Sequence, residues 1–115
     1  MPLARAFARV TIEDGSARGV VRRAHARRLC AGHFPGDPIV PGAYLAELMA
    51  DLAARLIASP AALATLERCV FLVRVTPEDE IVVTARRTSG TRAEAEVHRR
   101  GVCAARATLR FRGGR

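Results

Sequence analysis

Large aromatic side chains are scarce in this chain of 115 residues, which has no tryptophan, one tyrosine and four phenylalanines. Half of the residues are nevertheless hydrophobic, so disorder is not expected. A core without aromatic bulk must be built mainly from Val, Leu, Ile and Ala. A chain of this length is expected to fold as one domain, residues 1–115, and to bury about two-thirds of its unfolded surface without help from a metal or a disulfide.

Cysteine is also sparse, and long apolar segments are absent. Cys30, Cys69 and Cys103 are widely spaced and no CxxC pair occurs, so no zinc site is indicated. The longest apolar runs are far too short to span a bilayer. Met1–Val10 contains two arginines and no apolar block, which is unlike a signal peptide. The sequence therefore predicts a cytoplasmic protein.

Charge is strongly one-sided. The nineteen basic residues are all arginines and the acidic residues number eleven, so the formal net charge is +8. Such a field favours an acidic partner, and nucleic acid, an anionic membrane and an acidic protein are all candidates. A GC-rich genome explains the arginine content equally well. Nucleic acid is the weakest candidate because few aromatic side chains are available to stack on bases.

Turn residues divide the chain into six predicted strands and one long helix. The strands are expected at Ala6–Ile12, Arg18–Arg23 (continuing toward Leu29), Arg68–Val75, Glu80–Thr88, Thr91–Arg99 and Val102–Arg112. The helix is expected at Ala43–Ala58, where apolar residues recur at the helical period between Pro41-Gly42 and Ser59-Pro60. Short turns imply antiparallel pairing. The pattern predicts an α+β fold whose sheet curls around the helix and leaves an edge that invites a dimer.

The richest chemistry lies in the segment from Gly32 to Glu47. His33 falls among closely spaced prolines, which stiffen a backbone, and Glu47 falls on the predicted helix. Together they supply a base that titrates near neutrality and a carboxyl group, as general acid–base chemistry requires. A histidine in a loop is more often solvated or capped, and His25 and His98 are interpreted in that way.

The predicted helix also permits a purely structural interpretation. Glu47, Asp51 and Arg55 are spaced four apart on the side opposite the Leu/Met stripe. Such spacing normally marks a solvated stripe of ion pairs. Periodicity by itself therefore favours an exposed Glu47.

The motif around His33 resembles that of a known family. Gly32-His33-Phe34-Pro35, Pro38 and Pro41-Gly42, with Glu47 fourteen residues after His33, closely resemble the hot-dog-fold (3R)-hydroxyacyl-acyl-carrier-protein dehydratases of the glutamate type. Weaker similarity extends over most of the chain. Compact members of this kind also occur in secondary-metabolite clusters. The resemblance implies a hot-dog fold, an antiparallel sheet of about six strands wrapped around one long central helix.

The resemblance also implies a reaction, the dehydration of a (3R)-3-hydroxyacyl group on an acyl carrier protein to the trans-2-enoyl form. His33 would take the proton beside the thioester carbonyl, and Glu47, kept protonated part of the time in an apolar tunnel, would protonate the departing hydroxyl. Backbone N–H groups at Gly42 and Ala43 would hold the charge that develops on the carbonyl oxygen. No cofactor or metal is implied.

Two residues differ from those common in the family, and both are candidates for substrate binding. Asp51 stands where glutamine is common, and Tyr44 replaces an aliphatic residue at the start of the helix. Tyr44 is more often a packing residue than a catalytic one, and it is interpreted as a possible lining of the tunnel.

Partners follow from the same resemblance. In the family, the histidine of one subunit faces the acid of the other, so a homodimer or a higher oligomer of dimers is expected, with a heterodimer as the alternative. Acyl carrier proteins are acidic, and four arginines just before the motif are candidates for docking one: Arg22, Arg23, Arg27 and Arg28. A generic solvated surface is nearly as good an explanation of this cluster. Neither nucleic acid nor a membrane is expected as a partner.

Other functions remain open at this point. The same fold could serve a thioesterase, or a hydratase acting on enoyl-coenzyme A. A non-enzymatic protein, such as an inactive partner subunit or a basic nucleic-acid-binding module, is the third possibility. An inactive partner should lack His33 or Glu47, and this chain retains both.

Overall fold

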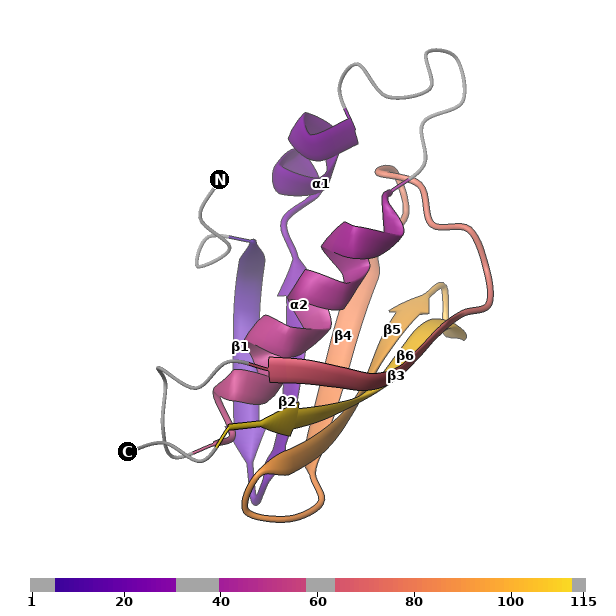
Figure 1. Ribbon diagram of the computed structural model, residues 1–115. Coiled ribbons are helices and arrows are strands. Elements are labelled where there is room, and N and C mark those ends of the chain that lie inside the picture. The colour runs from indigo at the N-terminus through magenta and orange to yellow at the C-terminus, as the bar shows by residue number, and fades with distance from the viewer. Residues whose placement is uncertain (1–5, 31–39, 58–63, 113–115) are drawn as a thin grey trace.

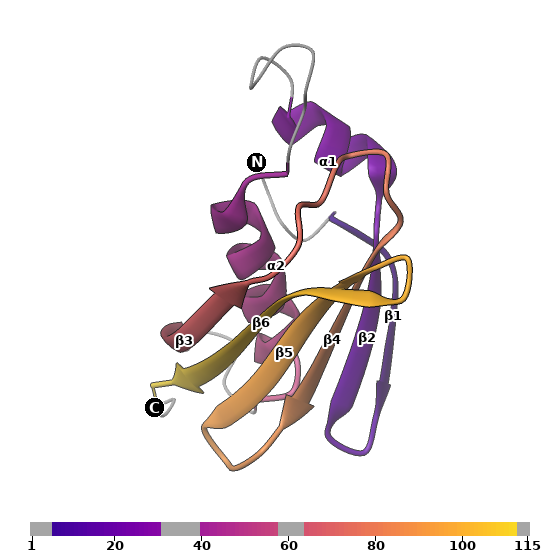
Figure 2. The ribbon, with the colours of Figure 1, turned by 90° about the vertical axis from the view of Figure 1, so that its right-hand side faces the viewer.

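The computed structural model describes residues 6–30, 40–57 and 64–112. Within them, one antiparallel sheet has the strand order β1-β2-β4-β5-β6-β3. The elements are β1 (Phe7–Glu13), β2 (Ser16–Val21), α1 (Arg23–Cys30), α2 (Gly42–Ala54), β3 (Ala64–Phe71), β4 (Ile81–Arg87), β5 (Arg92–Arg99) and β6 (Val102–Phe111). Helix α2 runs across one face of the sheet (Figure 1), and the opposite face is uncovered (Figure 2). The predicted α+β class and six-stranded antiparallel sheet are confirmed.

Two of the sheet's hairpins are closed by short turns that the sequence encodes locally. Asp14 and Gly15 have φ values of 43° and 77°, and Arg100 and Gly101 have values of 51° and 78°. Two successive residues with positive φ are the signature of the type I′ turn, whose twist matches that of the flanking strands. The turns expected between the first two predicted strands and between the last two are confirmed.

Strands β2 and β3 follow each other in the chain, but the connection through α2 places them apart in the sheet. The β1–β2 hairpin lies at one side of the sheet, and α2 carries the chain across to β3 at the opposite edge, where β3 pairs with β6. The chain then returns to β4, which pairs with β2. As a result β1 and β3 are the two edge strands of the sheet in the described part of the chain.

The core lies between α2 and the facing side of the sheet. Helix α2 buries Tyr44, Leu45, Leu48, Met49, Leu52 and Ala53. Alternate residues of the strands face it, including Ile81, Val83, Ala85, Ala93, Ala95, Val97, Ala105, Ala107, Leu109 and Phe111, all buried. Many of these strand residues are alanines, and their small side chains leave room for the leucines and methionine of α2. This packing confirms a core that is dominated by aliphatic residues.

A glycine in β2 permits one close contact of this core. A Cβ atom placed on Gly19 would lie 2.6 Å from Cδ1 of Phe7 and 3.3 Å from Cδ1 of Leu52. The first distance is too short for any real side chain, so Gly19 lets the Phe7 ring of β1 lie directly on β2.

The structure corrects the predicted extension of the second strand toward Leu29. Strand β2 ends at Val21, and Arg23–Cys30 is the helix α1, which the sequence did not predict. This segment contains no β-branched residue and is rich in the good helix formers alanine and arginine. The Arg22 carbonyl accepts hydrogen bonds from the backbone N–H groups of His25 and Ala26, which begins the helix.

Two other elements have a boundary more than two residues from prediction. Helix α2 ends at Ala54 rather than Ala58, and residue 58 lies outside the described residues. The third predicted strand is displaced toward the N-terminus: β3 is Ala64–Phe71, whereas Arg68–Val75 was expected. The apolar residues Leu72, Val73 and Val75 continue the strand pattern in sequence, but they lie in the connection to β4.

Candidate active site

The first turn of α2 begins where the sequence predicts. Pro41 is the N-cap, with φ −61° and ψ 142°, and its carbonyl accepts hydrogen bonds from the N–H groups of Tyr44 and Leu45. Gly42 and Ala43 therefore occupy the end of the helix at which backbone N–H groups and the helix dipole favour negative charge. A Cβ on Gly42 would lie 3.1 Å from Cζ of Phe71. The absence of a side chain lets that ring approach the helix start.

Glu47 lies on the exposed side of α2, one turn after the buried Tyr44. One further turn along, the Asp51 carboxylate accepts a hydrogen bond from Nη2 of Arg55 at 3.2 Å. The Arg55 guanidinium also stands 5.4 Å from the centroid of the Phe7 ring. The predicted polar stripe opposite the apolar stripe is confirmed, and Asp51 is held within it by an ion pair along the helix.

His33 belongs to residues 31–39, which lie outside the described residues, as do the side chain of Arg28 and the prolines of the motif before Pro41. The relation of His33 to Glu47 therefore stays a prediction.

A hollow of about 390 Å³ lies beside the first turn of α2. Its lining is predominantly apolar and comes from the helix start, from the end of β3 and from the segment after it: Val40, Gly42, Leu45, Phe71, Leu72, Val73, Arg74 and Val75. A hollow of this composition next to backbone N–H groups suits an acyl group whose thioester carbonyl needs hydrogen-bond donors.

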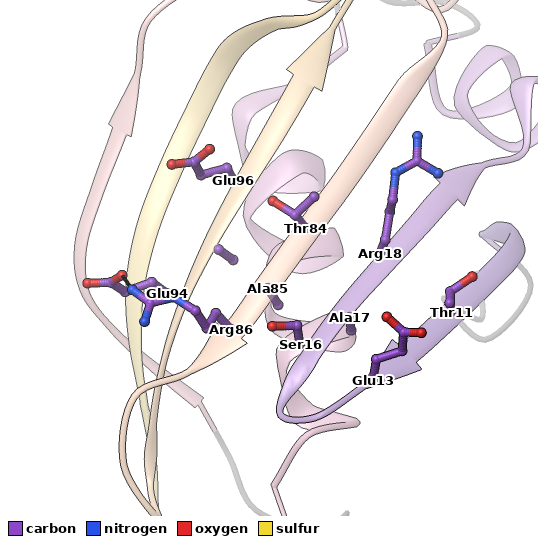
Figure 3. Close-up of a pocket in the computed structure, with 11 residues that line it drawn as sticks. Thr11, Glu13, Ser16, Ala17, Arg18, Thr84, Ala85, Arg86, Glu94 and Glu96 are labelled. Atoms are coloured by element: carbon purple, nitrogen blue, oxygen red, sulfur yellow. Dashed lines mark hydrogen bonds and ion pairs between the residues drawn. The ribbon is translucent and has the colours of Figure 1, made fainter.

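A larger hollow of about 530 Å³ lies on the other face of the sheet, away from α2 (Figure 3). Its side chains are mostly polar and come from β1, β2, β4 and β5: Thr11, Glu13, Ser16, Arg18, Thr84, Arg86, Glu94 and Glu96. The exposed Arg86 and Glu94 form an ion pair of 2.8 Å there. It contains none of the predicted site residues, and its charged groups face solvent. We therefore place the candidate site at α2.

His25 is a residue that sequence reasoning misjudged. It is 5% exposed, and its Nδ1 lies 2.7 Å from the hydroxyl of Tyr44. The two rings are stacked, with centroids 5.5 Å apart. The expectation of a solvated or capped His25 is wrong, because α1 turns this side chain onto α2. The signal in the sequence was Tyr44 itself, which replaces an aliphatic residue and whose buried hydroxyl needs a partner. His98, by contrast, is half-buried, with Nε2 2.9 Å from Oε1 of Glu96.

The arginines proposed for docking differ in their surroundings. Arg22 and Arg23 are exposed at the start of α1. Arg27 is exposed but forms a bidentate ion pair with Glu78, with Nε 2.8 Å from Oε2. Hydrogen bonding from Arg27 lowers the pKa of the Glu78 carboxyl, and the positive charges of Arg27 and Arg23 act in the same direction. Arg27 is therefore occupied in joining α1 to the β3–β4 connection.

A buried carboxylate organises that connection. Asp79 is 6% exposed and accepts hydrogen bonds from the backbone N–H and the hydroxyl of Thr76. Its oxygens also lie 3.2 Å from Nε of Arg99 and 3.5 Å from Nε of Arg100. Burial raises the pKa of Asp79, but the Thr76 hydrogen bonds and the two arginine charges together hold that pKa below its usual range.

Asp79→Asn is expected to lower the free energy of unfolding by about 1–3 kcal/mol at pH 7, because it removes a buried charge from its arginine partners. A carboxyl with a lowered pKa contributes stability that is present above the unfolded value, about 3.9. That contribution is lost as the pH falls through the folded value. Denaturant unfolding of wild type and variant from pH 7 to 3 should therefore show the difference shrinking below about pH 4.

Glu80, the exposed residue that follows Asp79, supplies the control for this measurement. Glu80→Gln is expected to change the free energy of unfolding by less than about 0.5 kcal/mol. A difference between wild type and Asp79→Asn that stays constant down to pH 3 would contradict the role assigned to the carboxylate charge.

The described residues 6–30, 40–57 and 64–112 contain neither a candidate metal centre nor a helix that could span a membrane. No group of three or more His, Cys, Asp or Glu side chains in this part of the chain could hold a metal ion. Neither α1 nor α2 is long and apolar enough to cross a bilayer.

The comparisons with known proteins agree with this architecture. The dehydratase heterocomplex ApeI:P from Xenorhabdus doucetiae contains a chain 15% identical, with a TM-score of 0.76 over 91% of this chain and 95% of that one. The smu.793 protein from Streptococcus mutans UA159, solved bound to acetyl CoA, is 16% identical, with a TM-score of 0.69 over 95% and 90%. A putative thioesterase from Silicibacter sp. TM1040 is 17% identical, with a TM-score of 0.68 over 95% and 79%.

At these identities the structural likeness shows the fold, which is the hot-dog fold expected from the resemblance. No curated protein sequence matches the chain. A family model does match it, described as ApeI-like, ApeI dehydratase, over residues 10–106. Because that match spans most of the sequence and includes both His33 and Glu47, the chain belongs to the ApeI-like dehydratase family.

Proposed function

We propose that this protein removes water from a (3R)-3-hydroxyacyl group carried by an acidic acyl carrier protein and leaves the trans-2-enoyl thioester. The observation that carries the proposal is the dehydratase family match over residues 10–106, which includes the motif from Gly32 to Glu47. The acyl carrier protein is the finer part of the proposal. It is supported by the net charge of +8 and by the exposed arginines of α1.

In the proposed reaction His33 removes a proton from the carbon beside the thioester carbonyl. The electrons of that C–H bond form the new carbon–carbon double bond, and the C–O bond to the 3-hydroxyl breaks. Glu47 gives the hydroxyl its proton, so the leaving group is water. Charge that builds on the thioester oxygen is stabilised by N–H groups in the first turn of α2, at Gly42 and Ala43. Proton return from His33 to Glu47 through solvent completes the cycle.

The surroundings of α2 support this assignment. Glu47 points away from the sheet, so the substrate can reach it without passing through the core. The apolar hollow beside Gly42 offers room for an acyl chain at the same end of α2. Glu47 is exposed, whereas the proposed acid should be partly enclosed. The proposed reaction therefore requires a further group of atoms to cover the exposed side of α2.

A partner subunit is proposed to supply this cover. Strand β3 is a sheet edge in the described residues, and apolar side chains near it remain exposed: Leu66 at 43%, Phe71 at 52% and Leu72 at 49%. An edge with such residues is suited to pairing with a second chain. The chain of similar fold from Xenorhabdus doucetiae was solved in a heterocomplex. The proposed partner is either a second copy of this chain or a related one.

The proposed activity is tested by incubating the protein with 3-hydroxyacyl carrier proteins of several chain lengths in both the 3R and 3S forms. Intact-protein mass spectrometry should show loss of one water from the 3R substrates. The matching coenzyme A thioesters, run in parallel, report on preference for the carrier. Release of free acid would point to the thioesterase alternative. No change in any substrate, with a partner subunit supplied as well, would overturn the proposal.

Docking of the carrier is expected to depend on Arg22 and Arg23, because Arg27 is already paired with Glu78. Replacing both by glutamate should raise KM for a carrier-bound substrate about tenfold and leave KM for a small thioester mimic within about twofold. Added salt should weaken use of the carrier-bound substrate by the wild type.

The matched control reverses the same number of charges elsewhere, at Arg18 and Arg87, which are exposed on β2 and β4. That variant should leave KM for the carrier-bound substrate within about twofold of wild type. Equal losses in the two double variants, or equal losses for carrier-bound and small substrates, would argue that the overall field and not the start of α1 binds the carrier.

A further inference from the structure

The most unusual polar contact in the core has no role in the reaction described above. The only tyrosine of the chain, Tyr44, and His25 are each 5% exposed, and the Tyr44 hydroxyl lies 2.7 Å from Nδ1 of His25. Their rings are nearly parallel, at 17°. Burial of a hydroxyl or an imidazole is unfavourable unless it is hydrogen-bonded, so each side chain restricts where the other can lie.

This contact joins two elements that flank the motif in the chain. His25 is in α1, which precedes residues 31–39, and Tyr44 is in the first turn of α2, which follows them. Packing alone would not require a polar pair here, since Phe and Leu would bury similar apolar area. The hydrogen bond adds directionality, which apolar contacts lack.

Helix α1 and the start of α2 also make contacts with other parts of the chain. The N–H of Arg22, just before α1, donates to the Ala6 carbonyl at 2.6 Å, and Arg27 of α1 binds Glu78. The N–H of Val40, just before α2, donates to the Val75 carbonyl at 2.7 Å. Helix α1 and the start of α2 are thus both fastened to the β3–β4 connection.

The His25–Tyr44 hydrogen bond links the two elements directly. Helix α1, the start of α2 and the β3–β4 connection are therefore each in contact with the other two. Three mutual contacts leave the first turn of α2 little freedom to tilt.

We infer that His25 and Tyr44 are positioning residues, whose hydrogen bond holds the first turn of α2 in the orientation that stabilises the thioester oxygen. The inference rests on the proposed function, because the N–H groups it positions, at Gly42 and Ala43, are those proposed to hold the developing charge. Tyr44 does not line the apolar hollow beside α2, and its hydroxyl is directed to α1. It is assigned a role that acts through the backbone of α2, and its lining of the acyl tunnel, suggested by the sequence, stays a separate prediction.

Tyr44→Phe removes only the hydroxyl, and His25→Leu removes only the imidazole. Each is expected to lower kcat about tenfold, the factor that matches the loss of one buried hydrogen bond, while KM changes less than about twofold. His25→Asn retains a hydrogen-bonding group near the position of Nδ1 and should recover part of the loss. The double variant Tyr44→Phe/His25→Leu should be no worse than the worse single variant, because both remove the same contact.

The control for a general loss of stability is Val83→Ala, which removes buried methyl groups from β4 behind α2. It should lower the melting temperature at least as much as Tyr44→Phe and leave kcat within about twofold. A fall in kcat in Val83→Ala equal to that in Tyr44→Phe would overturn the positioning role, since destabilisation alone would then account for both.

A second measurement does not depend on catalysis. NMR-detected amide hydrogen exchange of residues 44–46, whose N–H groups form the first hydrogen bonds of α2, should be about tenfold faster in Tyr44→Phe than in wild type, and little changed in Val83→Ala. If the wild type lacks dehydratase activity, the proposed function fails but the exchange still tests whether the pair fixes the helix start. Unchanged exchange at residues 44–46 in both Tyr44→Phe and His25→Leu would overturn the inference.

Discussion

Glu47→Gln is expected to lower turnover of a 3-hydroxyacyl carrier-protein substrate by about 10²–10⁴-fold, the usual contribution of one acid–base group. Glutamine has nearly the shape of glutamate but cannot give a proton to the departing hydroxyl. His33→Ala should cause a loss of the same order, because the proton beside the carbonyl then has no base. Both rates are measured by mass spectrometry of the substrate, with single-turnover conditions for the slow variants.

Neither substitution should disturb the fold. Glu47 is exposed on α2, so its replacement by an isosteric amide changes no buried contact. Melting temperatures within a few degrees of wild type would confirm that proton transfer, and not stability, accounts for the lost turnover.

Matched substitutions at comparable residues give the baseline for both variants. Glu13→Gln alters another exposed glutamate, at the end of β1, and His98→Ala alters a histidine of β5. Each should retain turnover within about twofold of wild type. Near-normal turnover in Glu47→Gln would refute its assignment as the acid, whatever the result for His33→Ala.

Mixing the two inactive variants is expected to restore activity, if the chain is active as a homodimer. When the site is shared, a mixed dimer has one site in which both His33 and Glu47 are wild type. At random exchange about half of the dimers are mixed, so recovery should approach about a quarter of full activity. The physical reason is the placement of Glu47, which faces away from its own sheet and toward any chain that covers the exposed side of α2.

Native mass spectrometry of the mixture verifies that subunits have exchanged. Each variant mixed with itself serves as the control and should remain inactive. Exchange without recovered turnover would mean that His33 and Glu47 of one chain form a complete site together, and the shared site would have to be abandoned.

The elements that sequence predicted well are those whose signals are local. Strand β4 alternates Ile81, Val83 and Ala85 toward α2, a period of two that is visible without a structure. The two type I′ turns depend on the conformational freedom of Gly15 and Gly101 within the turns themselves.

The candidate site divides in the same manner. The opening of α2 at Pro41-Gly42 and the polar stripe through Glu47 follow from helical spacing, and the structure reproduces both. Helix α1 was missed because its segment has neither the alternation of a strand nor a clear apolar stripe. Among the α1 side chains that the structure describes, the buried ones are His25 and Ala26, which are not recognisable as core residues from composition.

The amino-acid sequence by itself determined the fold class, the position of α2 and the family motif, because each is encoded by spacings within a short stretch of chain. Only the tertiary structure decided which distant polar groups meet. His25 and Tyr44 are 19 residues apart, and Arg27 and Glu78 are 51 apart. Such pairs form only when packing of α1 and α2 against the sheet brings their elements together. Because His25 and Tyr44 are buried, water cannot serve as their hydrogen-bond partner, so their polar atoms need partners within the protein.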